Sequence, residues 1–86
     1  MQAIITKYIG PTSRRGSRVK ATAMMGTLTV DWDRELSVEA NHLLAAQRLV
    51  DELNRERTGG TRWRRVAAGA GQLPDDSGYA VLVDIA

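Results

Sequence analysis

Apolar and polar residues alternate along the chain on both sides of Gly26, and this pattern constrains the fold more than any other feature. One set of alternate positions is apolar: Val19, Ala21, Ala23, Met25, Leu28, Val30 and Trp32. The other set is mostly polar and includes Arg18, Lys20, Thr22, Thr27, Thr29 and Asp31. Because successive side chains of a strand point to opposite faces of a sheet, the pattern predicts a β-hairpin turning at Gly26. One face of this hairpin must be buried and the other is polar.

Residues 38–57 follow the hairpin, contain neither Gly nor Pro, and predict a helix. Ser37 is placed to cap its start, and Glu39 suits the positive end of the helix dipole. An apolar stripe at helical spacing contains Ala40, Leu43, Ala46, Val50 and Leu53, flanked by Leu44 and Leu49. The helix is expected to end at Thr58-Gly59-Gly60, where a glycine accepts the left-handed conformation.

Three more segments, residues 2–9, 61–68 and 79–85, have the composition of strands, and turn-rich loops are expected at 10–17 and 69–78. The first strand is apolar on both faces and is expected to be central. Segment 61–68 holds three arginines and is expected at a sheet edge. The sequence therefore predicts a single small α+β domain over residues 1–86, with the order β-β-β-α-β-β. Its antiparallel sheet would pack one amphipathic helix on one face.

The composition excludes several classes of protein. The chain has no cysteine, so neither disulfides nor a thiolate metal site can stabilise it. No apolar run approaches the roughly 18–20 residues needed to cross a bilayer. The segment Met1–Lys7 lacks the basic start and long apolar stretch of a signal peptide. We expect a cytoplasmic protein of a bacterial host with no bound cofactor.

The formal net charge of +2 conceals an uneven distribution of charge along the chain. The basic residues Arg14, Arg15, Arg18 and Lys20 run from the first loop onto the polar face of the hairpin. Arg62, Arg64 and Arg65 would join them if the strand that carries them lies nearby. Clustered cations beside Thr and Ser hydroxyls are suited to phosphates, and the arginine fork is also suited to carboxylates. These seven residues are the predicted binding site for a partner or a nucleic acid.

Few residues could support catalysis. His42 is the only histidine and is interpreted as a boundary residue half covered by the sheet, since a general base would need a partner and a cleft. Asp31, Asp33 and Glu35 could hold a hard cation such as Mg²⁺, but they equally suit a solvated strand end, which we favour. Gly69-Ala70-Gly71 lacks the lysine and the strand–helix context of a phosphate loop. The sequence therefore favours a non-catalytic protein with no bound metal.

Three stretches together carry a resemblance: Ile5-Thr6-Lys7-Tyr8-Ile9-Gly10-Pro11-Thr12, Arg15-Gly16-Ser17-Arg18-Val19-Lys20-Ala21 and Leu73-Pro74-Asp75-Asp76-Ser77-Gly78-Tyr79. They resemble small, mostly uncharacterised proteins of bacteriophages, prophages and plasmids. The resemblance implies an accessory factor that blocks host defences by occupying a surface of the host machinery, as anti-CRISPR proteins do. We therefore expect an interaction protein that binds and inhibits or modulates a host protein or nucleoprotein complex. The alternative is a nucleic-acid-binding module that uses the basic face of the hairpin.

Overall fold

Five strands and one helix make up the computed structural model, which describes residues 2–56 and 62–85. The elements are β1 (Gln2–Ile9), β2 (Arg18–Ala23), β3 (Gly26–Asp31), α1 (Val38–Glu56), β4 (Trp63–Gln72) and β5 (Gly78–Ile85). The α+β class and the predicted order of elements are confirmed. The predicted helix end at 58–60 lies outside the described residues.

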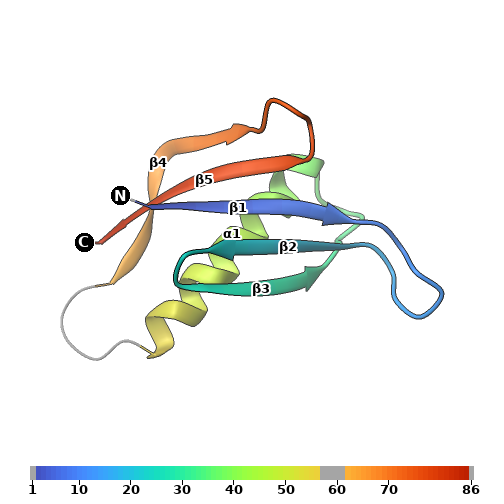
Figure 1. The fold of residues 1–86 in the computed structure, drawn as a ribbon, viewed down its shortest axis with the longest axis horizontal. Coiled ribbons are helices and arrows are strands. Elements are labelled where there is room, and N and C mark those ends of the chain that lie inside the picture. Colours follow the sequence, from blue (N-terminus) through green and yellow to red (C-terminus); the bar gives the residue numbers. More distant parts are fainter. Residues whose placement is uncertain (1, 57–61, 86) are drawn as a thin grey trace.

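The strands form one antiparallel sheet in the order β3-β2-β1-β5-β4 (Figure 1). The first strand is central and β4 lies at an edge, as the sequence predicts. The chain leaves one edge at the end of β3, crosses the sheet as α1 and returns at the opposite edge as β4. The two hairpins, β2–β3 and β4–β5, therefore flank the central strand on opposite sides.

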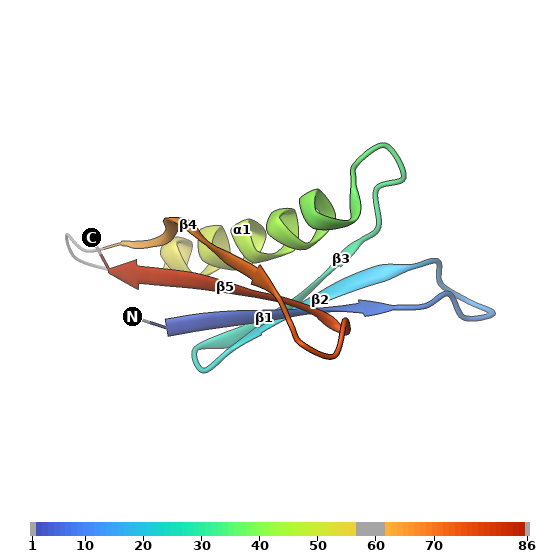
Figure 2. The same ribbon diagram turned by 90° about the horizontal axis from the view of Figure 1, so that it is seen from above.

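The helix covers only one face of the sheet (Figure 2). The core between the two layers consists of Ile4, Val19, Ala21, Ala45, Ala46, Leu49, Val50, Val81 and Val83. A helix is about 10–12 Å across, whereas the outer strands of a five-stranded sheet lie roughly 19 Å apart. One helix therefore leaves a groove along each edge strand. The groove beside β3 measures about 630 Å³ and the groove beside β4 about 350 Å³.

Two asparagines attach the ends of α1 to its neighbours. Asn41 is buried, accepts a hydrogen bond from the Asp33 amide at 2.8 Å and donates to the Asp33 carbonyl at 2.9 Å. Its Nδ2 also lies within reach of the Leu36 and Ser37 carbonyls. Asn54 Oδ1 accepts a hydrogen bond from the Trp63 amide at 2.7 Å, and Asn54 Nδ2 donates to the Trp63 carbonyl at 2.9 Å. The side chain thus pairs with both backbone groups of Trp63, in the way that a residue of an adjacent strand does.

The predicted cap of the helix is confirmed, because the Ala40 amide donates to Ser37 Oγ at 3.1 Å. The predicted turn at Gly26 is wrong. The pair Ala23–Gly26 closes the hairpin, so Met24 and Met25 form the turn and Gly26 begins β3. A Cβ at Gly26 would contact Leu53 at 3.5 Å, so the glycine lies where the helix packs against the hairpin.

The loop predicted at 69–78 is wrong in its first part, because β4 continues to Gln72 and only residues 73–77 form the turn. The ladder between β4 and β5 shifts register between Arg65 and Ala70. A Cβ at Gly69 would lie 3.0 Å from Val66 and 3.1 Å from Leu82. Glycine therefore marks an irregularity within a strand here, and not the start of a loop.

Candidate binding face

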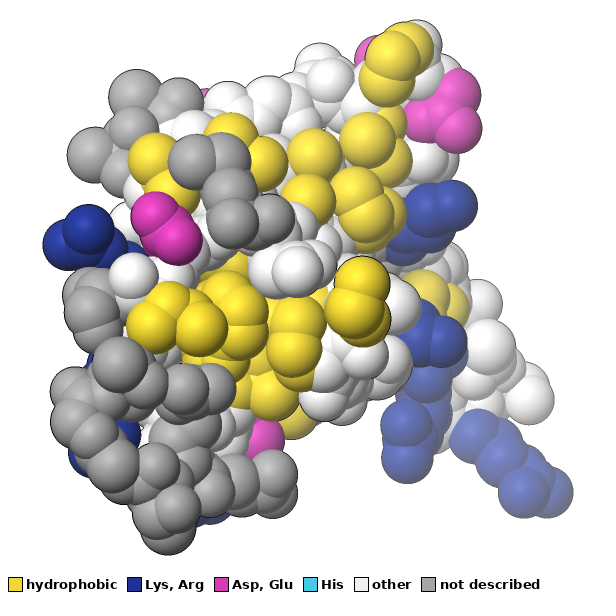
Figure 3. All heavy atoms as spheres, turned by 60° about the vertical axis from the view of Figure 1, so that its left-hand side comes forward, with side chains coloured by type: hydrophobic (Ala, Val, Ile, Leu, Met, Phe, Trp, Pro, Cys, Tyr) yellow, Lys and Arg dark blue, Asp and Glu magenta, His cyan; other side chains and the backbone are white. Residues whose placement is uncertain are grey.

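The face of the sheet that α1 does not cover is turned toward the viewer in Figure 1, and we call it the open face. The strand register brings these side chains together on it: Ala3, Ile5, Lys7 and Ile9 of β1; Arg18, Lys20 and Thr22 of β2; Thr27, Thr29 and Asp31 of β3; Arg64 of β4; and Ala80, Leu82 and Asp84 of β5. Its middle is apolar and half-buried, and threonines and cations surround this middle. Figure 3 shows hydrophobic side chains across one side of the molecule, with Lys and Arg side chains along their margin.

Two lysines face each other at the centre of the open face. Lys7 of β1 is the direct register partner of Lys20 of β2, and both side chains are exposed. Together with Ile5 and Thr22 they line a hollow of about 260 Å³. Like charges directly opposite each other destabilise a sheet. The hollow therefore concentrates positive potential over an apolar floor, and an anion bound there would relieve the repulsion.

Arg18 extends the positive charge toward the end of β2. Its register partners are Ile9 on one side and Asp31 on the other, so one carboxylate lies on the neighbouring strand. The Nε atom of Arg18 is buried and has no hydrogen-bond partner within the described part of the chain. A buried N–H group without a hydrogen bond is destabilising. A contribution to the stability of the fold therefore does not explain why an arginine is at position 18.

The loop over residues 10–17 continues from β1 and β2 and presents Arg14 and Arg15 to solvent. Thr12 organises it: the Thr12 amide donates to the Arg15 carbonyl at 2.7 Å, and Thr12 Oγ1 accepts from the Arg15 amide at 3.1 Å. A 2.8 Å hydrogen bond between Tyr8 Oη and Ser17 Oγ closes its base. The two arginines are therefore carried by an ordered turn.

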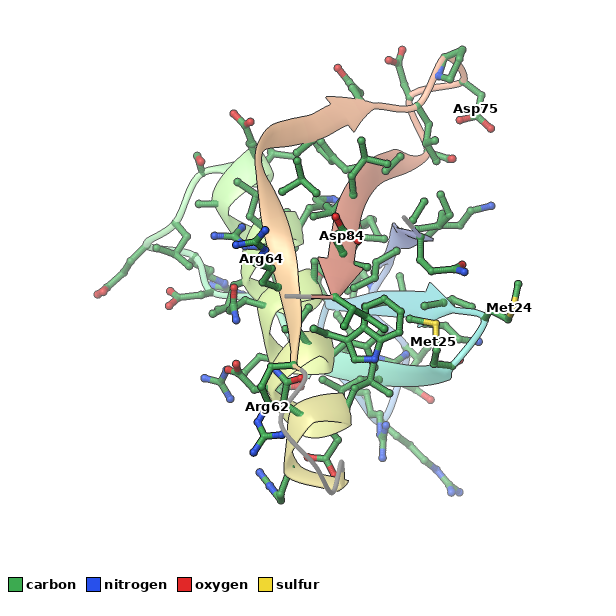
Figure 4. The ribbon with its side chains drawn as sticks, turned by 90° about the vertical axis from the view of Figure 1, so that its left-hand side faces the viewer. Met24, Met25, Arg62, Arg64, Asp75 and Asp84 are labelled. Carbon is green, nitrogen blue, oxygen red and sulfur yellow. The ribbon has the colours of Figure 1, made fainter. Side chains whose placement is uncertain are left out.

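The β4 arginines do not join this cluster. Strands β1 and β5 separate β2 from β4, and Figure 4 shows Arg62 and Arg64 on the β4 side, away from the Met24–Met25 turn. Arg64 faces Asp84 across the ladder, and Arg65 lines the groove between β4 and α1 together with Glu39. Of the seven predicted residues, Arg14, Arg15, Arg18 and Lys20 gather on β2 and the loop that precedes it. The other three belong to the β4 edge, where Arg64 is on the open face, Arg65 is on the helix side and Arg62 directly precedes the strand.

Lys7 and its neighbours Ile5 and Thr22 were not predicted as site residues. Lys7 lies on the first strand, and only the pairing of β1 with β2 brings it to Lys20. The available signal was its position two residues after Ile5, which puts both side chains on one face of a strand.

Among the acidic candidates, Asp33 has a local structural role. Asp33 Oδ1 accepts a hydrogen bond from the Glu35 amide at 2.9 Å, which shapes the connection between β3 and α1. Asp31 lies on the open face beside Arg18. Within residues 2–56 and 62–85 no group of three or more His, Asp or Glu side chains is placed to hold a metal ion.

His42 is more deeply buried than the sequence predicts, at 2% exposure, so its interpretation as a half-covered residue is wrong. Its Nδ1 lies 2.7 Å from Oγ1 of the buried Thr6, and the rings of Trp32 and Tyr79 pack beside it. Burial lowers the pKa of His42 below its ordinary value of 6.5. The residue is a neutral core group on the helix side of the sheet, remote from the open face.

No protein-family model, curated protein or solved structure matches this chain. No helix in the described ranges is long and apolar enough to span a membrane. The function of the open face therefore has to follow from the residues on it.

Proposed function

We propose that this chain is a non-catalytic interaction protein that binds an acidic surface of a partner protein through its open face and the loop over residues 10–17. The observation that carries the proposal is the facing pair Lys7 and Lys20 above Ile5. In the free protein this pair is expected to lower stability, since two like charges occupy facing positions. Residues that reduce the stability of the free protein are expected where a bound partner compensates for them.

A protein partner fits the open face better than a nucleic acid does. Protein interfaces combine an apolar centre with a polar rim, and arginine is enriched in them. The open face has this arrangement, with half-buried Ile5, Ile9 and Leu82 beside the cations. Base stacking requires exposed aromatic rings, and no aromatic side chain lies on the described open face, because Tyr8 and Tyr79 occupy the alternate positions.

The resemblance drawn from the sequence supports a host complex as the partner. A small protein that covers an acidic patch of a host complex inhibits it by occupying that surface, and no chemical step is needed. A role without catalysis agrees with the structure around the two candidate catalytic residues. His42 is buried beside the Thr6 hydroxyl, and Asp33 accepts a hydrogen bond from the Glu35 amide. Host-defence complexes, including those that anti-CRISPR proteins block, belong to the proposed partner class.

Nucleic-acid binding is the second candidate, and one observation favours it. Arg14 and Arg15 in the ordered turn continue the line of Arg18 and Lys20, so the cations follow a path away from the sheet. Such a path suits successive phosphates. Binding of this kind weakens steeply with salt, with a slope of about −0.9 for each neutralised phosphate of duplex DNA.

The test is an affinity capture from bacterial lysate with the tagged protein, with and without nuclease, read by mass spectrometry. Lys20→Glu is the site variant, and Arg65→Glu, on the helix side, is the matched charge reversal. A protein complex that survives nuclease, is lost with Lys20→Glu and is retained with Arg65→Glu supports the proposal. Recovery that disappears with nuclease moves the function to nucleic-acid binding. Capture that is indifferent to Lys20→Glu overturns the assignment of the open face.

A further inference from the structure

The two edges of the sheet differ in how well they are protected against pairing with another strand. Natural sheets protect their edges with bulges, charged side chains and proline. The β4 edge has such features: its ladder shifts register between Arg65 and Ala70, where Gly69 lies, and it carries the charged Arg64. The β3 edge pairs with β2 without a shift from Gly26 to Asp31 and contains neither proline nor lysine.

The unpaired backbone groups of β3 can be identified from its register. The Trp32 amide donates to the Ser17 carbonyl at 3.0 Å, so these two residues form a hydrogen-bonded pair that continues the β2–β3 ladder. Bonded and non-bonded pairs alternate along an antiparallel ladder. Val30 and Leu28 therefore also bond to β2, whereas Asp31, Thr29 and Thr27 direct their amides and carbonyls away from the sheet.

We propose that β3 pairs with β3 of a second copy of this chain, antiparallel and centred on Thr29. All three outward-directed residues find partners in this register: Thr29 faces Thr29, and Thr27 faces Asp31, once on each side of the two-fold axis. About six backbone hydrogen bonds would form, two for each facing pair. No like charges face each other, and threonine pairs are favourable between strands.

The side chains of β3 on the helix side are also compatible with pairing to a second copy of this chain. In this register Leu28 of one copy faces Val30 of the other, and both side chains are half-buried in the single chain. The groove between β3 and α1, lined in part by Val30, Trp32 and Leu44, leaves room beside them. Its lining also includes Asp33, Arg34 and Arg48, so residues of both charge signs border it. A surface that carries both charge signs suits a self-complementary contact, in which each patch must match itself.

The pairing would place both helices on one side of a continuous sheet and both open faces on the other, because facing residues of a ladder point to the same face. A dimer would then present two copies of the Lys7–Lys20 hollow to one partner surface, and binding would gain from bivalency. The dimer itself does not depend on what the open face binds.

The chain has no cysteine, so single cysteines can test the register directly. Facing Cα atoms of a bonded antiparallel pair lie about 5.5 Å apart, within disulfide range. Thr29→Cys is expected to form a disulfide-linked dimer under mild oxidation on a non-reducing gel. Thr22→Cys lies on the same face but on an inner strand, and is expected to remain monomeric.

Sedimentation velocity of the unmodified chain should show a concentration-dependent shift from the 9.4 kDa monomer toward twice that mass. Thr29→Lys places two like charges opposite each other and is expected to abolish the shift, whereas Thr22→Lys is expected to keep it. Circular dichroism verifies that each variant is folded. A monomer at every concentration up to about 0.5 mM, a level far above the dissociation constant of a specific dimer, overturns the proposal. Equal disulfide formation at positions 22 and 29, or a folded Thr29→Lys that still dimerises, overturns it as well.

Discussion

Thr6 and His42 lie 36 residues apart in the chain and meet in the core, with Thr6 Oγ1 2.7 Å from His42 Nδ1. Thr6 is on the central strand and His42 is near the start of α1, so this polar contact ties the helix to the middle of the sheet. Both residues are almost completely buried. A buried polar group is tolerated when it is paired, so His42 Nδ1 depends on the Thr6 hydroxyl, which also lies 3.4 Å from the Tyr79 carbonyl.

Replacement of Thr6 by valine is expected to lower the free energy of unfolding by about 1–3 kcal/mol. Valine keeps the shape and the strand preference of threonine but leaves His42 Nδ1 buried without its partner. Thr6→Ser keeps the hydroxyl, loses one methyl group and should cost about 1 kcal/mol. Urea denaturation followed by circular dichroism measures both. A Thr6→Val protein as stable as the parent would contradict the role assigned to this hydrogen bond.

The stability of the protein should fall as the pH falls through 6.5. Burial lowers the pKa of folded His42, so below about pH 6.5 the unfolded state binds a proton that the folded state does not bind. The loss between pH 7.5 and 5.5 can reach about 1.4 kcal/mol. His42→Gln should remove this pH dependence while lowering stability overall. The carboxyl of Asp75 does not interfere, since hydrogen bonds from Ser77 and, to a smaller extent, the charge of Lys7 lower its pKa below 3.8.

The two asparagines that attach α1 should respond unequally to aspartate. In Asn41→Asp an oxygen replaces the Nδ2 that faces the carbonyls of Asp33, Leu36 and Ser37, and a buried charge is added. This change should cost about 3 kcal/mol or more. Asn54→Asp loses the bond to the Trp63 carbonyl at a half-buried position and should cost about 1 kcal/mol. Equal losses in thermal denaturation would contradict the greater importance of Asn41.

The sequence predicts those parts of the fold that depend on local periodicity. The alternation around the hairpin and the stripe on residues 38–57 locate β2, β3 and α1 closely, because each pattern reports directly on one buried face. The roles of Gly26 and Gly69 were not predictable, because their close contacts with Leu53 and with Val66 and Leu82 arise from tertiary packing. Glycine gives the same signal in a turn, at a bulge and beneath a packed helix.

The candidate site was predictable only in part for a related reason. Arg18 and Lys20 lie on the polar face of a recognisable strand, so the hairpin alone identifies them. Their neighbour Lys7 belongs to another strand, and the distance of Arg64 from them depends on strand order. Strand order is set by long-range packing, and a local pattern does not contain it.

The facing lysines predict a measurable repulsion in the free protein. Lys20→Gln should raise the free energy of unfolding by about 0.2–1 kcal/mol, since it removes the like charge opposite Lys7. Lys7→Gln should give a smaller gain, because Lys7 also interacts favourably with the charge of Asp75.

In the double variant the repulsion is removed only once, so the two gains should not add, and the double-mutant cycle should report a repulsive coupling between the two lysines. The coupling should shrink when salt is raised from about 0.05 to 1 M, as screening requires for exposed charges. Gln keeps a long side chain at both positions, so packing over Ile5 is retained. Loss of partner capture in the same, more stable Lys20→Gln protein would show that stability is given up for binding at this pair. Additive effects, or a coupling of the opposite sign, would mean that the two ammonium groups avoid each other in solution and that the hollow between them is not a preformed anion site.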